Sequence, residues 1–307
     1  MTTPQLLQPP VNVAAGAGPS LPHSRAAGRL RSRPLREAAI FVGLVLGIVL
    51  GIAVGLPHAP GITTPLLTMV TPVVVVLLIA MFGTARGHRR ALLSTLGVHR
   101  FGLRSWPVAF VLSAVTILVL PFSAAIALGS AAVAPVGSST HFWLHAGSLL
   151  NILATTTVLA LGEEIGWRGY LLPRVQALVS KRRAALVVGF VHGLFHLPLI
   201  LLTTTYDSIG SRWIVAPMVV VTMTLAGVIY AWLRDRSGSV WPVALAHSTI
   251  NTFLDGAGLI TVVAPVTLAY TAGESGIATF VAVLGVAAAL LVRGSTWRSN
   301  VSPAITT

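Results

Sequence analysis

Long apolar stretches, separated by short polar linkers, run through most of the chain. A helix needs about 20 apolar residues to cross a bilayer, and several of these stretches reach that length. Because they are continuously apolar and do not alternate with polar positions, they predict helices and not strands. We therefore predict an all-α, polytopic transmembrane helical bundle of about eight spans. The predicted spans are 38–56, 64–83, 106–128, 146–165, 184–204, 213–233, 240–254 and 276–292.

The linkers between these spans differ regularly in charge. Arginine-containing segments precede the first span and follow the second, fourth, sixth and eighth, whereas the other linkers carry at most one basic residue, Arg212. Cytoplasmic linkers of membrane proteins are enriched in Lys and Arg, so this alternation predicts that both termini are cytoplasmic. The Arg-rich, Lys-poor composition and the lack of organelle signals favour a bacterial plasma membrane.

The amino-acid composition limits the kinds of binding partner that we expect for this protein. Only 9% of the 307 residues are charged, whereas soluble domains have about a quarter. The net charge of +13 could suit nucleic acid, but the arginines lie in linkers between spans. We therefore expect membrane lipids as partners, and no nucleic acid. The chain has no cysteine, which excludes disulfides, thiolate nucleophiles and cysteine-bound metal but leaves His/Glu metal sites open.

The chain divides into three segments by composition. Residues 1–35, rich in Pro, Gly, Ser and Arg, predict a disordered cytoplasmic tail, followed by a transmembrane domain over 36–295 and a short cytoplasmic tail over 296–307. No cleavable signal peptide is apparent, so we expect the first span to be retained. Residues 168–183 mix apolar and basic side chains, which is typical of an amphipathic helix on the cytoplasmic surface or of a helical linker with a solvated basic face.

Three groups of polar residues interrupt the apolar spans. A charge at the bilayer centre costs roughly 2.5–3.5 kcal/mol on insertion scales, so such residues are functional candidates by default. Residues four positions apart share one face of a helix, and we expect these groups to line one cavity open to the cytoplasm. The groups are Glu163-Glu164-x-x-x-Arg168, His192-x-x-x-His196 and His247-x-x-x-Asn251.

Helix geometry gives the two glutamates different expected roles. Glu164 precedes Arg168 by four residues, which is the favourable order for an ion pair. Glu163 is turned about 100° away, so we expect its carboxylate to be freer for proton transfer. A glutamate beside a histidine can take a proton from water and return it to a leaving amine. His247 and Asn251 could supply donors for an oxyanion.

In combination, these residues resemble the motifs of the CPBP family, the CAAX-protease and bacteriocin-processing proteins, also called the Abi family. The family motifs are Glu-Glu-x-x-x-Arg, Phe-x-x-x-His and His-x-x-x-Asn, and the resemblance covers about 146–255. It implies an intramembrane endopeptidase whose active site faces the cytoplasm. By this resemblance, Glu163 and His196 would activate water, and His247 and Asn251 would stabilise the tetrahedral oxyanion.

The same resemblance implies that Glu164 and Arg168 shape the site. His192 stands where the family usually has Phe, either as an aromatic-sized filler or as an added polar group. No cofactor is expected, because the family mechanism is better described as water activation by glutamate. The alternative is a zinc ion bound by His192, His196 and His247 together with a glutamate, although the zincin sequence His-Glu-x-x-His is absent.

Two other classes of function compete with the peptidase. One is a non-catalytic membrane partner or bacteriocin-immunity protein on the same scaffold, and the other is a small proton-coupled transporter with Glu163 and the histidines as its relay. The complete motif set argues against the first, and the lack of a visible inverted repeat argues against the second. A peptidase would act on a peptide or protein, and eukaryotic relatives take a prenylated C-terminal motif. A peptide pheromone, a bacteriocin precursor and an anchored membrane protein all remain open as substrates.

Overall fold

The computed structural model describes residues 23–132, 139–206, 210–255, 264–293 and 297. These residues form helices joined by turns and contain no strand, so the all-α prediction is confirmed. The α-helices are α1 (His23–Gly55), α2 (Thr63–Leu78), α3 (Arg86–Thr95), α4 (Trp106–Ala114), α5 (Leu120–Ala127), α6 (Ser139–Glu164), α7 (Leu172–Gln176), α8 (Lys181–Leu202), α9 (Arg212–Ser237), α10 (Trp241–Asp255), α12 (Pro265–Thr271) and α13 (Ile277–Val292). Three π-helical segments interrupt them, η1 (Ile79–Gly83), η3 (Val115–Val119) and η4 (Ile165–Leu171), and two 3₁₀ turns are η2 (Leu103–Ser105) and η5 (Thr204–Tyr206).

Six helical segments within the described residues are long and apolar enough to cross a membrane. They correspond to the first six predicted spans: Arg33–Gly55, Thr63–Gly83, Leu103–Ala127, Trp143–Gln176, Lys181–Leu202 and Arg212–Ser237. The last two predicted spans correspond to α10 and α13, which have 15 and 16 residues and are shorter than a full crossing requires. The chain is a multi-pass membrane protein, with at least these six segments of spanning length.

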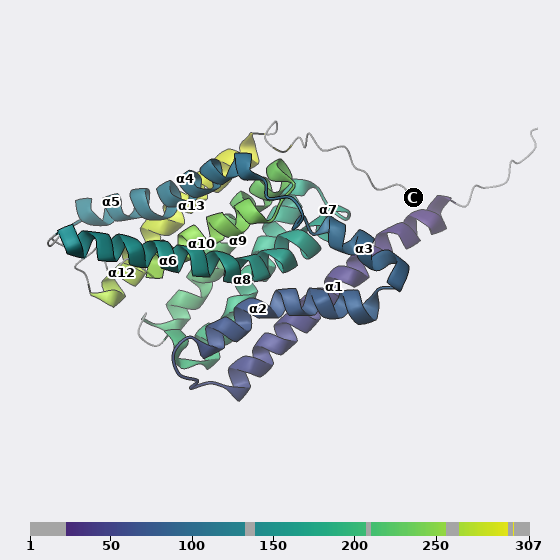
Figure 1. The fold of residues 1–307 in the computed structure, drawn as a ribbon, viewed down its shortest axis with the longest axis horizontal. Coiled ribbons are helices and arrows are strands. Elements are labelled where there is room, and N and C mark those ends of the chain that lie inside the picture. The colour runs from purple at the N-terminus through teal and green to yellow at the C-terminus, as the bar shows by residue number, and fades with distance from the viewer. Residues whose placement is uncertain (1–22, 133–138, 207–209, 256–263, 294–296, 298–307) are drawn as a thin grey trace, which may run out of the picture.

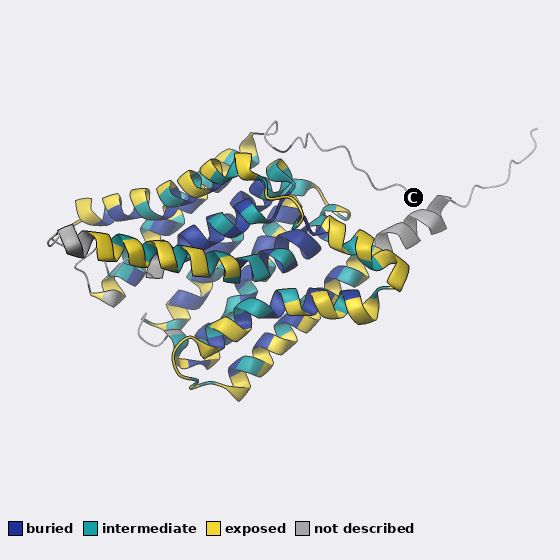
Figure 2. Ribbon diagram, viewed as in Figure 1, coloured by how far each residue is buried: buried dark blue, intermediate teal, exposed yellow. Residues whose placement is uncertain are grey.

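Helices α8 and α9 form the buried centre of the bundle, with α6 and α10 beside them (Figure 1; Figure 2). Their close contact depends on glycines. A Cβ atom on Gly189 would lie 2.5 Å from the Thr224 carbonyl oxygen, and one on Gly193 would lie 2.9 Å from the Val220 backbone. Gly189 and Gly193 form the small-x-x-x-small pattern that lets membrane helices approach closely. The backbone of α8 is therefore held against α9 without intervening side chains.

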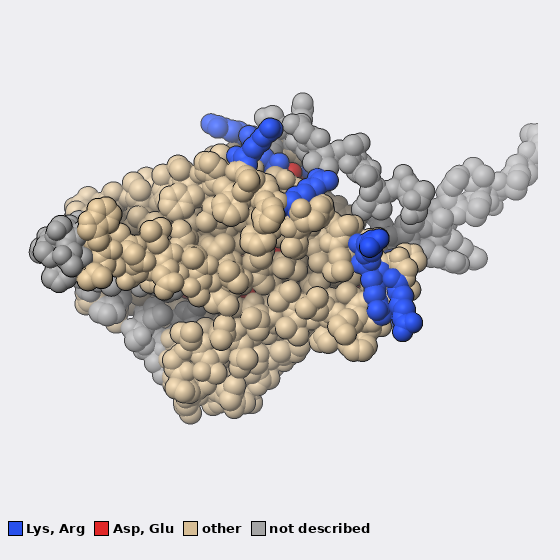
Figure 3. Space-filling model, viewed as in Figure 1, with Lys and Arg blue, Asp and Glu red and all other residues tan. Residues whose placement is uncertain are grey.

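The outer helices expose apolar side chains, as expected of surfaces that face lipid (Figure 2). On the face drawn in Figure 3, Lys and Arg side chains gather at one end of the helices, and the rest of that face is almost free of charge. Arg86 and Arg90 on α3 are among the exposed basic residues. This distribution is that of a membrane-embedded body with one strongly basic end.

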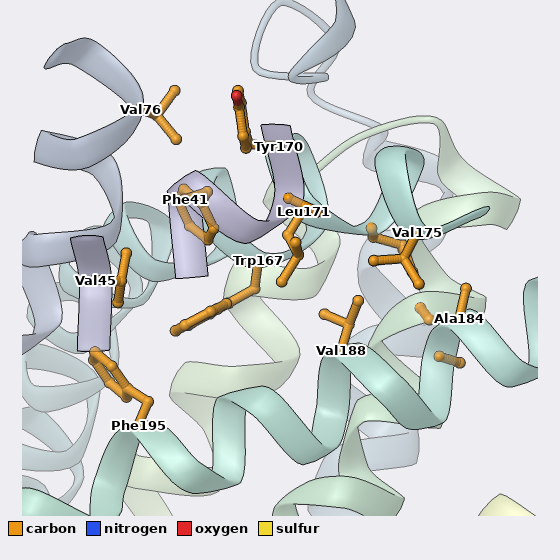
Figure 4. Packing of buried hydrophobic residues seen from close by; sticks show 14 of the residues in the cluster. Phe41, Val45, Val76, Trp167, Tyr170, Leu171, Val175, Ala184, Val188 and Phe195 are labelled. Atoms are coloured by element: carbon orange, nitrogen blue, oxygen red, sulfur yellow. The ribbon is translucent and has the colours of Figure 1, made fainter. Parts of the chain in front are cut away.

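Trp167 anchors the cluster that joins α1, η4 and α8 (Figure 4). Its ring meets Phe41 of α1 edge-on with ring centroids 5.6 Å apart, and meets Phe195 of α8 edge-on at 5.3 Å. Residues 166–171 are all buried. The first part of the segment 168–183 is therefore internal, which differs from the surface helix that we expected, because Trp167 and its neighbours pack against the first two spans.

Helix α1 begins at His23, inside the segment 1–35 that we expected to be a tail. Glu37 accepts hydrogen bonds from Arg33 at 3.0 Å and from Arg174 of α7 at 2.8 Å. These ion pairs connect the start of the first span to the chain that follows η4. Most of the predicted tails, 1–22 and 298–307, lies outside the described residues.

Candidate active site

The two glutamates end helix α6 at the point where the chain enters the π-helix η4. A π-helical turn is wider than an α-turn and is often found at functional sites. Glycines allow this wide turn to lie deep in the bundle. A Cβ on Gly166 would lie 2.5 Å from Pro72 of α2, and one on Gly169 would lie 2.9 Å from the Leu96 carbonyl oxygen. The turn that follows the glutamates is therefore fixed by close backbone packing.

Glu164 forms the predicted ion pair with Arg168. Arg168 Nη1 donates to both carboxylate oxygens, at 2.9 Å to Oε1 and 3.1 Å to Oε2, and both side chains are fully buried. His247 Nδ1 lies 2.9 Å from Glu164 Oε1 and donates to it, since a carboxylate oxygen accepts. Glu164 thus joins η4 to α10, and His247 Nε2 is left as the ring nitrogen that can face a substrate.

Tyr230 of α9 closes this side of the site, a residue that the sequence did not lead us to single out. Its ring stacks on His247 with centroids 5.5 Å apart, and Arg168 Cζ lies 4.7 Å from its centroid. Its hydroxyl is buried and has no hydrogen-bond partner among the described residues. The available signal was a tyrosine in the middle of an apolar span, where a polar hydroxyl needs a reason to be buried.

Glu163 has histidine and tryptophan partners. His192 Nε2 lies 2.9 Å from Glu163 Oε2, and Trp167 Nε1 donates to the same oxygen over a longer 3.4 Å. Glu163 is only 2% exposed. The carboxylate that we expected to be freer is therefore held in place, but by two ring N–H groups and not by a cation.

His192 occupies the centre of the site. Its Nδ1 lies 3.2 Å from Arg168 Nη1, while its Nε2 contacts Glu163. Its ring lies 5.4 Å from the ring of His196 and 5.6 Å from that of His247. Of the two roles considered for this position, the structure places it as a polar group, because both ring nitrogens contact charged side chains.

His196 and Asn251 are less directly connected. His196 Nε2 is buried without a hydrogen-bond partner among the described residues, so a polar group such as water could occupy that position. Asn251 is half-buried and follows His247 by one helical turn, on the same face of α10. The other five predicted site residues are joined in one hydrogen-bonded chain, in the order Glu163, His192, Arg168, Glu164 and His247.

Two pairs of hydroxyl side chains form hydrogen bonds between α6 and α10, next to this hydrogen-bonded network. Thr157 and Ser248 are hydrogen-bonded at 2.6 Å, and Thr156 and Thr252 at 3.1 Å. Hydrogen bonds between spans help to fix the relative position of membrane helices. The threonine run at 155–157 gave a weak signal for this contact, because consecutive hydroxyls are unusual in an apolar span.

The groups that come closest to a metal site are Glu163, His192 and His247, whose nearest ligand atoms lie within 4.8 Å of one another. His196, which we included in the zinc alternative, is not in this group. A metal on His192 Nε2 would require the proton on Nδ1, because a neutral imidazole has one N–H. That proton would point at Arg168 Nη1, itself only a donor, at 3.2 Å. The donor pattern around His192 therefore does not fit a metal ligand.

Residues 145–253 match the family model described as type II CAAX prenyl endopeptidase Rce1-like, and a search of curated proteins gives no match. The matched segment contains η4, α7, α8 and α9 and most of α6 and α10, and these elements carry every residue of the network. The match confirms the resemblance to the CAAX proteases that the motifs indicated. Residues 145–253 of this chain are therefore similar to the Rce1-like CAAX proteases, a family of membrane-embedded proteases.

Proposed function

We propose that this protein is a peptidase in which Glu163 activates a water molecule that hydrolyses a peptide bond. The observation that carries the proposal is the environment of Glu163. Its carboxylate is buried, two neutral ring N–H groups hold one oxygen, and no cation neutralises it directly. A positioned carboxylate of this kind suits a general base, whereas Glu164 is already committed to Arg168 and His247.

In the proposed reaction, Glu163 takes a proton from water as the oxygen attacks the peptide carbonyl carbon. The unpartnered Nε2 of His196 holds this water. The carbonyl oxygen becomes an oxyanion when its double bond opens. When the oxyanion re-forms the carbonyl, the C–N bond breaks and Glu163 returns the proton to the leaving amine.

The oxyanion is stabilised by donors from α10. In a protonated imidazole both nitrogens donate, so His247 can bond Glu164 through Nδ1 and the oxyanion through Nε2. The Glu164 carboxylate balances the charge of that ring, and Arg168 keeps the carboxylate in place. The side-chain amide of Asn251 supplies a further donor. His247 and Asn251 therefore act on the substrate, and Glu164 and Arg168 act through His247.

The substrate class follows from the position of the site. The carboxylates lie where α6 meets η4, in a span whose far end, at Gln176, is followed by the basic residues of 181–183. On the topology expected from the linker charges, with both termini cytoplasmic, this end is cytoplasmic, in a bacterial plasma membrane. The substrate is therefore a membrane-associated peptide or protein, with lipidated C-terminal segments among the first to test, as the name of the matched family suggests.

Substitution of the proposed base is the decisive test. Glu163→Gln preserves the shape of the side chain but removes the base, so turnover should fall roughly 10²–10⁴-fold. Membrane-fraction peptidomics of cells with wild type and with Glu163→Ala would identify the substrate, and the purified protein would give the rate. Glu37→Gln is a matched control, because Glu37 is an acid outside the site. Turnover that survives Glu163→Gln would refute the proposal.

The proposal involves no metal. Stringent chelation of the purified protein should therefore leave turnover unchanged, and added zinc should not increase it. The reason is that His192 Nδ1 accepts from Arg168, which leaves its Nε2 as a donor and not as a ligand. Activity that disappears on chelation and returns only with zinc would show that the water is activated by an ion.

A further inference from the structure

We propose that His192 is a positioning residue that passes a hydrogen bond from Arg168 to Glu163 and so sets the orientation of the catalytic carboxylate. This inference rests on the proposed function of Glu163. His192 stands at the position that is Phe in the motif Phe-x-x-x-His. We assign it a role in the rate of hydrolysis and not in substrate binding.

The partners of His192 fix its tautomer. Arg168 Nη1 carries two hydrogens and no lone pair; one hydrogen serves Glu164 and the other points at His192 Nδ1, 3.2 Å away. Nδ1 must therefore accept, which places the single proton of the neutral ring on Nε2. Nε2–H then donates to Glu163 Oε2 at 2.9 Å. The direction of the relay is thus from guanidinium to imidazole to carboxylate.

The backbone and the rings around His192 keep it in this position. Its side chain is fully buried, and its ring stacks on Trp167 with centroids 5.1 Å apart and an interplanar angle of 29°. Gly189 and Gly193 hold the same turn of α8 against α9. The ring cannot leave Glu163 without moving Trp167 or separating two central helices.

In this arrangement the two carboxylate oxygens of Glu163 have different roles. Oε2 receives both ring N–H groups, from His192 and Trp167, and Oε1 is left for the attacking water. A neutral donor orients the carboxylate without cancelling its charge, which a direct ion pair to Arg168 would do. His192 also connects Glu163 to the Glu164–Arg168 pair, and Glu164 in turn contacts His247. The same hydrogen-bonded network therefore positions both the base and His247.

The test compares two substitutions at this position. His192→Phe removes both hydrogen bonds but keeps an aromatic ring, so kcat should fall on the order of 100-fold with KM nearly unchanged, since the base is misplaced and the substrate contacts are not. His192→Gln offers an amide oxygen to Arg168 and an amide N–H to Glu163, and should recover most of the loss. His145→Phe, the same change at an exposed histidine of α6, is the matched control.

A second measurement does not depend on how well the Phe variant folds. Nitrogen NMR of protein labelled at histidine should contain the signal of a neutral ring with a bare Nδ1 and a protonated Nε2 that disappears in His192→Gln and is thereby assigned to His192. If the signal lost in His192→Gln belongs instead to a ring protonated on Nδ1, or on both nitrogens, the proposal is overturned.

Three kinetic outcomes would also overturn it. They are wild-type kcat in His192→Phe, no recovery in folded His192→Gln, and a change mainly in KM. Failure of the proposed function can be distinguished from failure of this inference. It would appear as turnover that survives Glu163→Gln, whatever the His192 variants show.

Discussion

The two halves of the site, one around Glu163 and the other around Glu164, differ in how a buried carboxylate is stabilised. Glu164 receives a guanidinium and an imidazole, and is fully enclosed between η4, α9 and α10. Glu163, the adjacent residue, receives only ring N–H groups from α8 and η4. This difference in charge compensation is why the proposed function takes the first carboxylate as structural and the second as the general base.

The largest expected effect comes from removing the cation of the Glu164 half. Arg168→Met would leave a buried carboxylate without its ion pair, and breaking such a pair typically costs about 3–5 kcal/mol. Unfolding measured in detergent should show this loss, together with loss of turnover. Arg174→Met, which removes a partly exposed ion pair with Glu37, should cost about 1 kcal/mol. Equal losses in the two variants would mean that burial does not make the Glu164–Arg168 pair more important to stability than a partly exposed pair.

A smaller effect is expected from disturbing the helix that serves Glu163. Gly189→Ala places a methyl group against the Thr224 carbonyl oxygen, and overpacking of this kind costs about 1–3 kcal/mol. Because His192 lies one turn away, kcat should fall as well. Gly47→Ala is the control, since an added Cβ there has nothing within 4 Å. Unchanged kcat in a destabilised Gly189→Ala protein would show that the Glu163 half tolerates movement of α8.

The smallest effect concerns the hydroxyl contact beside the Glu164 half. Thr157→Val removes the hydrogen bond to Ser248, and such bonds between membrane helices average about 0.6 kcal/mol. A double-mutant cycle with Ser248→Ala would isolate this contribution. Thr155→Val, at an exposed position of the same helix, should be neutral. A coupling energy near zero would mean that the Thr157–Ser248 contact does not help to position α10.

Local spacing predicted the parts of this protein that depend on one helix. The apolar stretches gave the first six spans, and the four-residue spacing gave the Glu164–Arg168 pair, because both follow from helix geometry. The spacing also placed the three polar groups on single helix faces. It could not determine which face meets which. The family resemblance associated Glu163 with His196, whereas the imidazole in contact with Glu163 is that of His192.

Two other features depended on tertiary packing. The fourth span was predicted to end at 165, but the chain continues through η4 to Gln176, because glycines let the wide turn enter the bundle. Tyr230 joined the site because α9 packs against α10 and η4, contacts that no polar pattern in the sequence indicates. Both features can be predicted only when the arrangement of the helices in space is known. The periodicity of a single helix gives no information on that arrangement.

The π-helical turn also makes the site sensitive to the number of residues in it, and not only to their identity. Glu163 contacts Trp167 and Glu164 contacts Arg168, two pairs offset by a single position. Deleting Gly166 would put Arg168 in the place that Trp167 now holds relative to Glu163. The guanidinium would then lie beside the carboxylate that we propose as the base, although every side chain of the site would still be present. Among variants of this protein, single-residue insertions and deletions between Glu164 and Trp167 should therefore be tolerated less well than substitutions.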